Sequence, residues 1–220
     1  MKIERAREVG KLPDRLYKLI ADRFHIVTNG IDRIERSSGL QYPYYYIDPN
    51  LILSTSNAEF EQFGIFFART IPLVSKNKKL AVVIQLTAPL IAYGLLGSIH
   101  AILGHEFMHY VSFIRRILQM NVISDEIAGT LFEGKYKDFD SLIDPRDIFK
   151  KDPVLVDHIT RRFPEGFKDL KLEQKVIKNW INKHLPLTII PIDSNIVKIP
   201  IEVIVNTEVD KILKEKIEQL

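Results

Sequence analysis

Apolar residues recur at two spacings along the chain, and these spacings predict where helices and strands alternate. Between residues 12 and 24 apolar side chains fall three or four positions apart, which predicts an amphipathic helix. The β-prone runs 42–47 and 51–55 are separated by the turn-forming sequence Asp48-Pro49-Asn50. We therefore expect these two runs to form a hairpin or a pair of neighbouring strands.

The middle of the chain predicts a helix, a strand and a longer helix. Aromatic and aliphatic side chains at positions 60, 63, 67 and 71 form a stripe at helical spacing, which predicts a helix over 56–70. The run 79–87 predicts a strand. A helix is then predicted to begin at Pro89 or Leu90 and to end near Leu118, and its glycines at 94, 97 and 104 would permit close packing.

The second half of the chain predicts shorter elements and completes an α+β fold. In chain order these are a helix at 125–132 with Ser124 as its cap, a loop-rich segment at 137–157, a helix at 172–184, strands at 187–190 and 196–205, and a terminal helix from about residue 208. We expect residues 1–163 to form the main domain. Residues 164–220 are expected to form a small C-terminal α+β lobe, or to belong to the same domain.

Composition narrows the classes of function. The chain has 220 residues, of which 46% are hydrophobic and 27% charged, as in globular proteins. Its 31 basic and 28 acidic residues nearly balance, so the net charge gives no reason to expect binding to nucleic acid. Because cysteine is absent, any metal site must use histidines and carboxylates.

Two segments bear on localisation. The charged N-terminus, residues 1–8, does not have the apolar core of a secretory signal, which favours a cytoplasmic protein. Residues 80–104 contain no Asp, Glu, Lys or Arg and would be long enough to cross a bilayer as one helix. The strand-like run 82–87 and the following Pro89 instead favour a buried strand and helix, so we expect no membrane span.

Residues 105–109 read His-Glu-Phe-Met-His and fall within the long predicted helix. Four residues apart on a helix, His105 and His109 face the same way, so their ring nitrogens can converge on one metal ion. Glu106 lies beside the first histidine and can reach a metal-bound water. The alternative is a hydrogen-bonded pair of core histidines, in which case Glu106 would need a partner in an apolar setting.

A hydrolytic zinc site usually has three protein ligands and one open position. The metzincin spacing is absent, because Ser112 and Arg115 stand where that group has a glycine and a third histidine. A carboxylate on the following helix is the other common solution, and Glu126, 17 residues after His109, is well placed for it.

With His105, Glu106, His109 and Glu126, the chain resembles the gluzincin group of zincin metallopeptidases over residues 90–132. The resemblance implies a small mixed sheet packed on the helix that carries the pentapeptide, and Zn2+ held by His105, His109 and Glu126. Many gluzincins have an aspartate four residues beyond the ligand glutamate, where this chain has Thr130. Asp125 is therefore the alternative, either as the ligand or in the role of that aspartate.

The resemblance also implies a mechanism. Zinc would lower the pKa of a bound water to about 7 and polarise a peptide carbonyl, and Glu106 would carry the proton of that water to the leaving amine. Candidates to stabilise the tetrahedral intermediate are Tyr110, Tyr136 and His158. We prefer His158, because it follows a proline-containing loop that could fold over the cleft.

The expected substrate is a peptide or an unfolded protein segment, and the sequence does not indicate how many chains associate. Thr130 supports a second class of function, a non-catalytic zincin-fold binding or regulatory protein. A membrane-associated metalloprotease is a third reading. It is disfavoured because no apolar helix after residue 120 carries the Asp-Gly motif of site-2-type intramembrane proteases.

Overall fold

The computed structural model describes residues 3–55, 63–77, 79–118, 142–164, 166–191, 203–204 and 206–220. Within these ranges a mixed sheet is built from β1 (Tyr44–Asp48), β5 (Leu80–Thr87) and β4 (Ala68–Val74), in that order. β1 runs parallel to β5, and β4 pairs with β5 antiparallel. The predicted strand at 79–87 is thus confirmed as the central strand, and its alternate residues Val82, Ile84 and Leu86 are buried.

A second sheet has the order β3 (Phe63–Phe66), β2 (Leu51–Thr55) and β6 (Leu187–Pro191). β2 is antiparallel to β3 and parallel to β6, so the predicted strand at 187–190 is confirmed. The predicted pairing of 42–47 with 51–55 is wrong, because β1 and β2 belong to different sheets. The turn exists, with the Asn50 N–H donating to Asp48 Oδ1, but both strands find their partners at long range.

The helix predicted over 56–70 is wrong from residue 63 onward, where the chain forms β3 and β4. A spacing of four residues places side chains on one face of a helix and equally on one face of a strand. The stripe at 63, 67 and 71 was therefore compatible with both structures. Residues 56–62 lie outside the described ranges.

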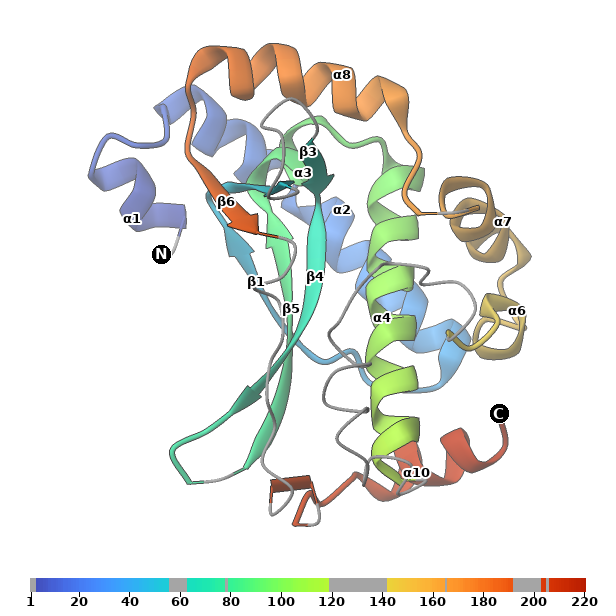
Figure 1. Cartoon of the computed structure of the whole chain (residues 1–220). Helices are drawn as coiled ribbons and strands as arrows, with labels where there is room; N and C mark the ends of the chain where they lie inside the picture. The colour runs from blue at the N-terminus through green and yellow to red at the C-terminus, as the bar shows by residue number, and fades with distance from the viewer. Residues whose placement is uncertain are drawn as a thin grey trace.

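Two long helices, α2 (Asp14–Ser38) and α4 (Leu96–Leu118), lie on the same side of the first sheet (Figure 1). The predicted helix at 12–24 is confirmed but continues to Ser38, where Gly39 ends it in the left-handed conformation and donates its N–H to Glu35 O. Gly30 lies inside this helix because a Cβ there would be 2.7 Å from Leu103 Cδ1 and 2.8 Å from His100 Cδ2 of α4.

The helix predicted from Pro89 to Leu118 ends at the expected residue but is divided into α3 (Ala88–Tyr93) and α4. Arg23 of α2 explains the break, since its guanidinium donates to the carbonyl oxygens of Ile91 and Gly94 at the end of α3. Side-chain donation to these oxygens replaces the helical hydrogen bonds that a continuous helix would have made.

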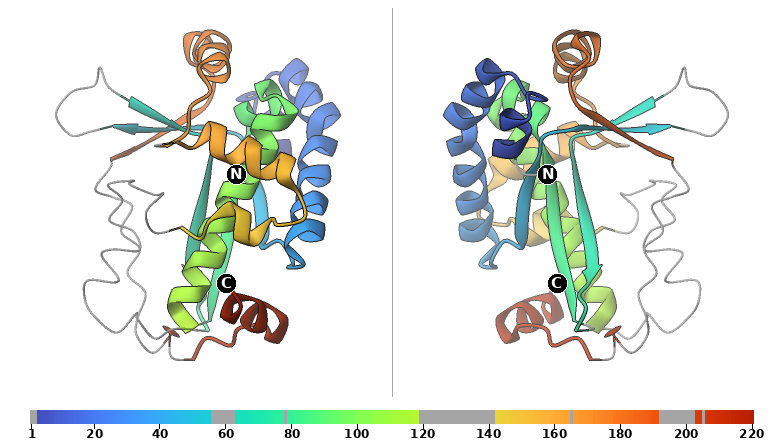
Figure 2. Two further views of the ribbon diagram at one scale, coloured as in Figure 1. Left: turned by 90° about the vertical axis from the view of Figure 1, so that its right-hand side faces the viewer. Right: turned by 90° about the vertical axis from the view of Figure 1, so that its left-hand side faces the viewer.

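The remaining helices surround this centre. They are α1 (Ile3–Glu8), α6 (Pro145–Ile148), α7 (Pro153–Arg162), α8 (Leu170–Asn179), the 3-10 turn η2 (Ile181–Lys183) and α10 (Lys211–Glu218). α7 packs against α4, α8 lies over α3, and α10 lies at the C-terminal end of α4 (Figures 1 and 2). The predicted helices at 172–184 and from 208 are confirmed with shifted ends. The helix predicted at 125–132, with Ser124 as its cap, falls outside the described residues. Of the strand predicted at 196–205 only residues 203–204 are described, and these are helical, so the prediction is wrong there.

Glycines set the spacing between α4 and α7, as their positions predicted. A Cβ on Gly104 would be 2.7 Å from Ile159 Cδ1, and a Cβ on Gly97 would be 3.1 Å from His158 Cε1. Both glycines therefore face α7, and they allow the two helix backbones to approach closely.

The hydrophobic core is one connected cluster that reaches from Ala6 to Ile217. It includes Ile159 and Val176, which lie on either side of the predicted boundary at 163/164. The fold class is α+β.

In the part of the chain that the structure describes, no helix combines the length and the apolar character needed to cross a membrane.

Candidate metal centre

α4 carries the His-Glu-Phe-Met-His sequence into the interior. The helical turns before and after this sequence are buried on nearly all sides, because α4 lies between a sheet and two other helices. The side chains of His105 and Glu106 are buried, with 5% and 7% of their surface exposed, and His109 is partly buried. As the spacing predicted, the two histidines meet, and their Nε2 atoms are 3.1 Å apart.

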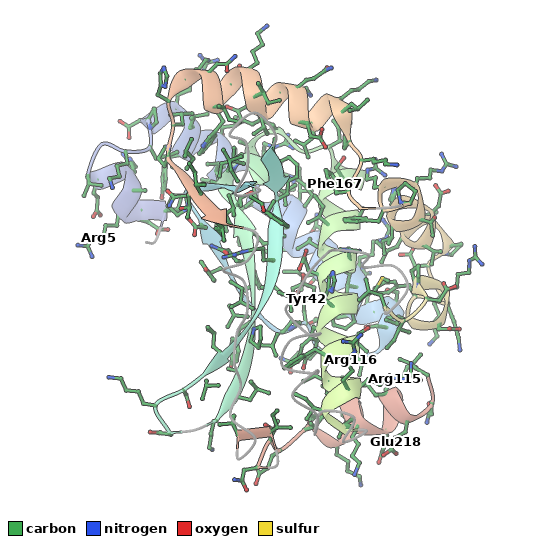
Figure 3. All side chains as sticks on the ribbon, viewed as in Figure 1. Arg5, Tyr42, Arg115, Arg116, Phe167 and Glu218 are labelled. Atoms are coloured by element: carbon green, nitrogen blue, oxygen red, sulfur yellow. The ribbon has the colours of Figure 1, made fainter. Side chains whose placement is uncertain are left out.

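Aromatic rings enclose His105 from one side. The ring of Phe163, just after α7, stacks on the imidazole, and Phe163 in turn contacts Phe167 at 5.3 Å between centroids. Phe167 contacts Phe67, which directly precedes β4, also at 5.3 Å between centroids. Figure 3 shows Phe167 between the upper parts of β4 and α4. The linker between α7 and α8 thus closes one wall of the site.

Burial keeps both histidines neutral. Desolvation, followed by the proximity of His109, lowers the pKa of His105 well below its usual value. Desolvation, followed by the charge of Arg116, lowers the pKa of His109 to about 4. At neutral pH both rings therefore carry the lone pair that a metal ion requires.

The histidine pair fits zinc in distance. Two nitrogens at about 2.0–2.1 Å from a tetrahedral zinc would be about 3.3 Å apart, close to the 3.1 Å between the Nε2 atoms. Nδ1 of His105 is buried and has no hydrogen-bond partner among the described residues. If Nε2 bound a metal ion, Nδ1 would carry the proton and would need a hydrogen-bond acceptor. That acceptor is not found among the described residues.

A third ligand is not found in the described ranges, where no three His, Cys, Asp or Glu side chains gather as a metal-binding group. Both predicted carboxylates, Glu126 and Asp125, fall in residues 119–141, as does Tyr136, and so lie outside these ranges. The described part of the chain therefore supplies two imidazoles with converging nitrogens, and a glutamate that follows the first of them in the sequence.

The carboxyl group of Glu106 faces β4 and the start of β1. Thr70 Oγ1 lies 2.7 Å from Glu106 Oε2 and 3.0 Å from the backbone oxygen of the same residue. Tyr42 donates its hydroxyl proton to Leu103 O at 3.1 Å, and its pKa is raised well above the usual value, first by burial and then by the nearby Glu106. Figure 3 shows Tyr42 beside the middle of α4.

Thr70 and Tyr42 were not predicted as site residues. Thr70 lies on the side of β4 that faces α4, between the buried residues Ala68 and Pro72. A polar residue between two buried ones on the same strand face was the only feature of the sequence that could have indicated a role for it. Nothing in the spacing of the sequence relates it to Glu106, which is 36 residues away.

The structure does not bring His158 to the histidine pair. Its ring lies against Gly97, eight residues before His105 and thus about 12 Å away along the helix axis. The prediction assumed a loop that folds over the site, but residues 153–162 form α7, whose packing on α4 directs His158 to the other end of that helix. Tyr110, the other described candidate, is partly buried near Asp210, the N-cap of α10.

A polar network occupies the end of α4 where His158 lies. Arg33 of α2 forms a two-pronged ion pair with Asp152, the N-cap of α7, at 2.5 and 2.6 Å. His100 bridges the network to α2, with Nε2 at 3.1 Å from Ile26 O and Nδ1 at 3.4 Å from Arg33. Since every one of these groups has a partner in the network, it is best explained as a support for the packing of three helices.

Comparisons of this chain with protein-family models, with curated proteins and with solved structures find no match. The features that favour a metal centre are those of the chain itself: two buried, neutral imidazoles with converging nitrogens, and a neighbouring glutamate in the sequence whose carboxyl group is bonded by Thr70.

Proposed function

We propose that this protein is a zinc-dependent metallopeptidase with a zincin-like, gluzincin-type site. One observation carries the proposal: the Nε2 atoms of His105 and His109 are 3.1 Å apart on a buried helix. The mixed sheet packed on α4 supports the same reading, because its antiparallel strand β4 lies directly against the helix that carries the histidines.

His105 and His109 would hold the metal, and Glu126 is the proposed third ligand. A zinc ion in this place would supply Lewis acidity for a peptide carbonyl and would make an attacking water more acidic. Glu106 would accept the proton of that water and deliver it to the leaving nitrogen. Phe163 would exclude bulk water from one face of His105, which strengthens electrostatic interactions at the site.

Metal analysis of the purified full-length protein tests the proposed site. We expect about one zinc per chain in the wild type and a loss of stoichiometric zinc in His105→Ala, His109→Ala and Glu126→Ala. His25→Ala is the matched control, because His25 is exposed on α2 and its variant should keep the metal. Absence of stoichiometric metal from the wild type would overturn the proposal and leave a hydrogen-bonded pair of core histidines.

Peptide turnover tests the proposed chemistry. The zinc-loaded wild type should cleave an unstructured peptide library, and Glu106→Gln should abolish cleavage while the zinc content stays unchanged. A wild type that binds zinc in the predicted manner but cleaves no peptide would exclude the peptidase and favour a non-catalytic metal-binding module.

A further inference from the structure

We propose that Thr70 is a positioning residue that holds the carboxyl group of Glu106 in the orientation for proton transfer. This inference rests on the proposed peptidase function. It adds a residue that the histidine-glutamate motif does not contain, contributed by a strand that lies 36 residues earlier in the chain.

The contact is specific in its geometry. The Thr70 hydroxyl has one proton and two nearby acceptors on Glu106, at 2.7 Å for Oε2 and 3.0 Å for the backbone oxygen. The shorter distance to Oε2 is that of a strong O–H···O bond. The same hydroxyl thus lies over both the backbone and the carboxyl group of the residue that would move the proton.

Thr70 is itself held firmly. It lies within β4, opposite Ile84 in the antiparallel register with β5, and β4 packs directly on α4. A threonine side chain has restricted rotation about its first bond, so the hydroxyl position follows from the strand. A glutamate side chain has three rotatable bonds, and a fixed donor at its end removes orientations that would not support proton transfer.

A pair of near-isosteric substitutions separates the hydroxyl from the packing. Thr70→Val keeps the branched shape and removes the donor, and we expect kcat to fall about 10- to 100-fold with KM within about twofold of the wild type. Thr70→Ser keeps the donor and should retain activity within about threefold.

Thr87→Val is the matched control. Thr87 belongs to the same sheet, is fully buried and donates its hydroxyl proton to Phe67 O at 3.0 Å. This variant also loses a buried hydrogen bond, so it should lower stability without changing kcat. All of these variants should retain the wild-type zinc content, which would show that any loss of activity is not a loss of metal.

A second measurement needs neither metal nor substrate. In metal-free protein with 13C-labelled glutamate carboxyl groups, the Glu106 signal is assigned by its absence in Glu106→Gln. Thr70→Val should shift this signal, and Thr70→Ser and Thr87→Val should leave it near the wild-type position. An unmoved signal in Thr70→Val, or turnover within about twofold of the wild type, would overturn the role of Thr70.

The two proposals fail in distinguishable ways. A wild type without peptide turnover rejects the peptidase and, with it, the role of Thr70 in proton transfer, even if the carboxyl signal shows that the contact exists. An active wild type with an active Thr70→Val variant rejects only the role of Thr70.

Discussion

The ring of Phe163 lies flat against the imidazole of His105, with 3.7 Å between their centroids and 9° between their planes. This contact joins the end of α7 to the middle of α4. Since His109 meets the same imidazole edge-on, at 4.6 Å between centroids, the orientation of His105 is fixed by two rings from different parts of the site.

Replacing Phe163 should weaken metal binding without removing a ligand. We expect Phe163→Leu to lower zinc affinity about 10-fold, because groups that orient a ligand typically contribute about 10- to 100-fold. Competition with a chelator of known affinity would measure the change. Phe149→Leu is the control, since Phe149 is also buried but packs on Phe107, and the variant should leave zinc affinity within about twofold. Equal affinities in the two variants would contradict the role of Phe163.

The metal-free protein should lose stability on acidification through His109. Its pKa is lowered from 6.5 to about 4 in the folded state, so below pH 6.5 the unfolded chain takes up a proton that the folded chain does not. The contribution of neutral His109 to the free energy of unfolding is fully present above pH 6.5. It decreases as the pH falls toward 4, by up to about 3 kcal/mol in total.

Urea unfolding at pH 7.5, 6.0 and 5.0 in the presence of a chelator would measure this effect as the difference between the wild type and His109→Gln. The stability advantage of the wild type should shrink as the pH falls. His25→Gln, at an exposed site, should show no such trend. A difference for His109→Gln that does not depend on pH would contradict the prediction.

Two aspartates on α7 should differ strongly in their contribution to stability. Asp152→Ala breaks the partly buried pair with Arg33, whose side chains are 18% and 21% exposed, and removes the cap that accepts from the Leu155 N–H. We expect a loss of about 2–4 kcal/mol.

Asp157→Ala is the comparison for Asp152→Ala. It breaks only a pair with Arg161 in which the two side chains are 44% and 76% exposed, and should cost less than about 0.5 kcal/mol. Denaturant unfolding at neutral pH would measure both variants, and similar losses in the two would refute the structural role of the Arg33 network.

Unfolding should occur in one transition. Trp180 is the only tryptophan of the chain, is fully buried and donates from Nε1 to Pro186 O at 2.8 Å, so its fluorescence reports on the C-terminal part. It contacts Tyr93 of α3, and the core is continuous across residue 163. Fluorescence and circular dichroism should therefore give coincident curves. Separate midpoints would instead indicate an independent lobe at 164–220.

The local pattern of apolar residues was enough to predict the helices and strands that are buried along most of their length. β5 and α4 are buried along most of their length, and the convergence of His105 and His109 follows from helix geometry alone. β1 and β2 were paired wrongly because their true partners, β5, β3 and β6, depend on which distant segments the chain brings together.

The same limit explains which site residues the sequence did not reveal. Thr70 and Phe163 contact the pentapeptide from 36 and 58 residues away, on elements whose position is set by packing. His158 was placed by assuming a loop where the chain forms a helix. The assignment of Glu126 stays a prediction, since that residue lies outside the described ranges.

The glycines that face α4 and lie within it have a consequence for how the site would receive an ion. A side chain larger than hydrogen would collide with Leu103 at Gly30 and with Ile159 at Gly104. α4 is therefore in close contact with α2 on one side and with α7 on another. Rotation of α4 about its axis would require both α2 and α7 to move away from it. The two imidazoles are therefore aimed at one point as soon as the chain has folded, and an arriving cation would meet a preorganised pair of nitrogens.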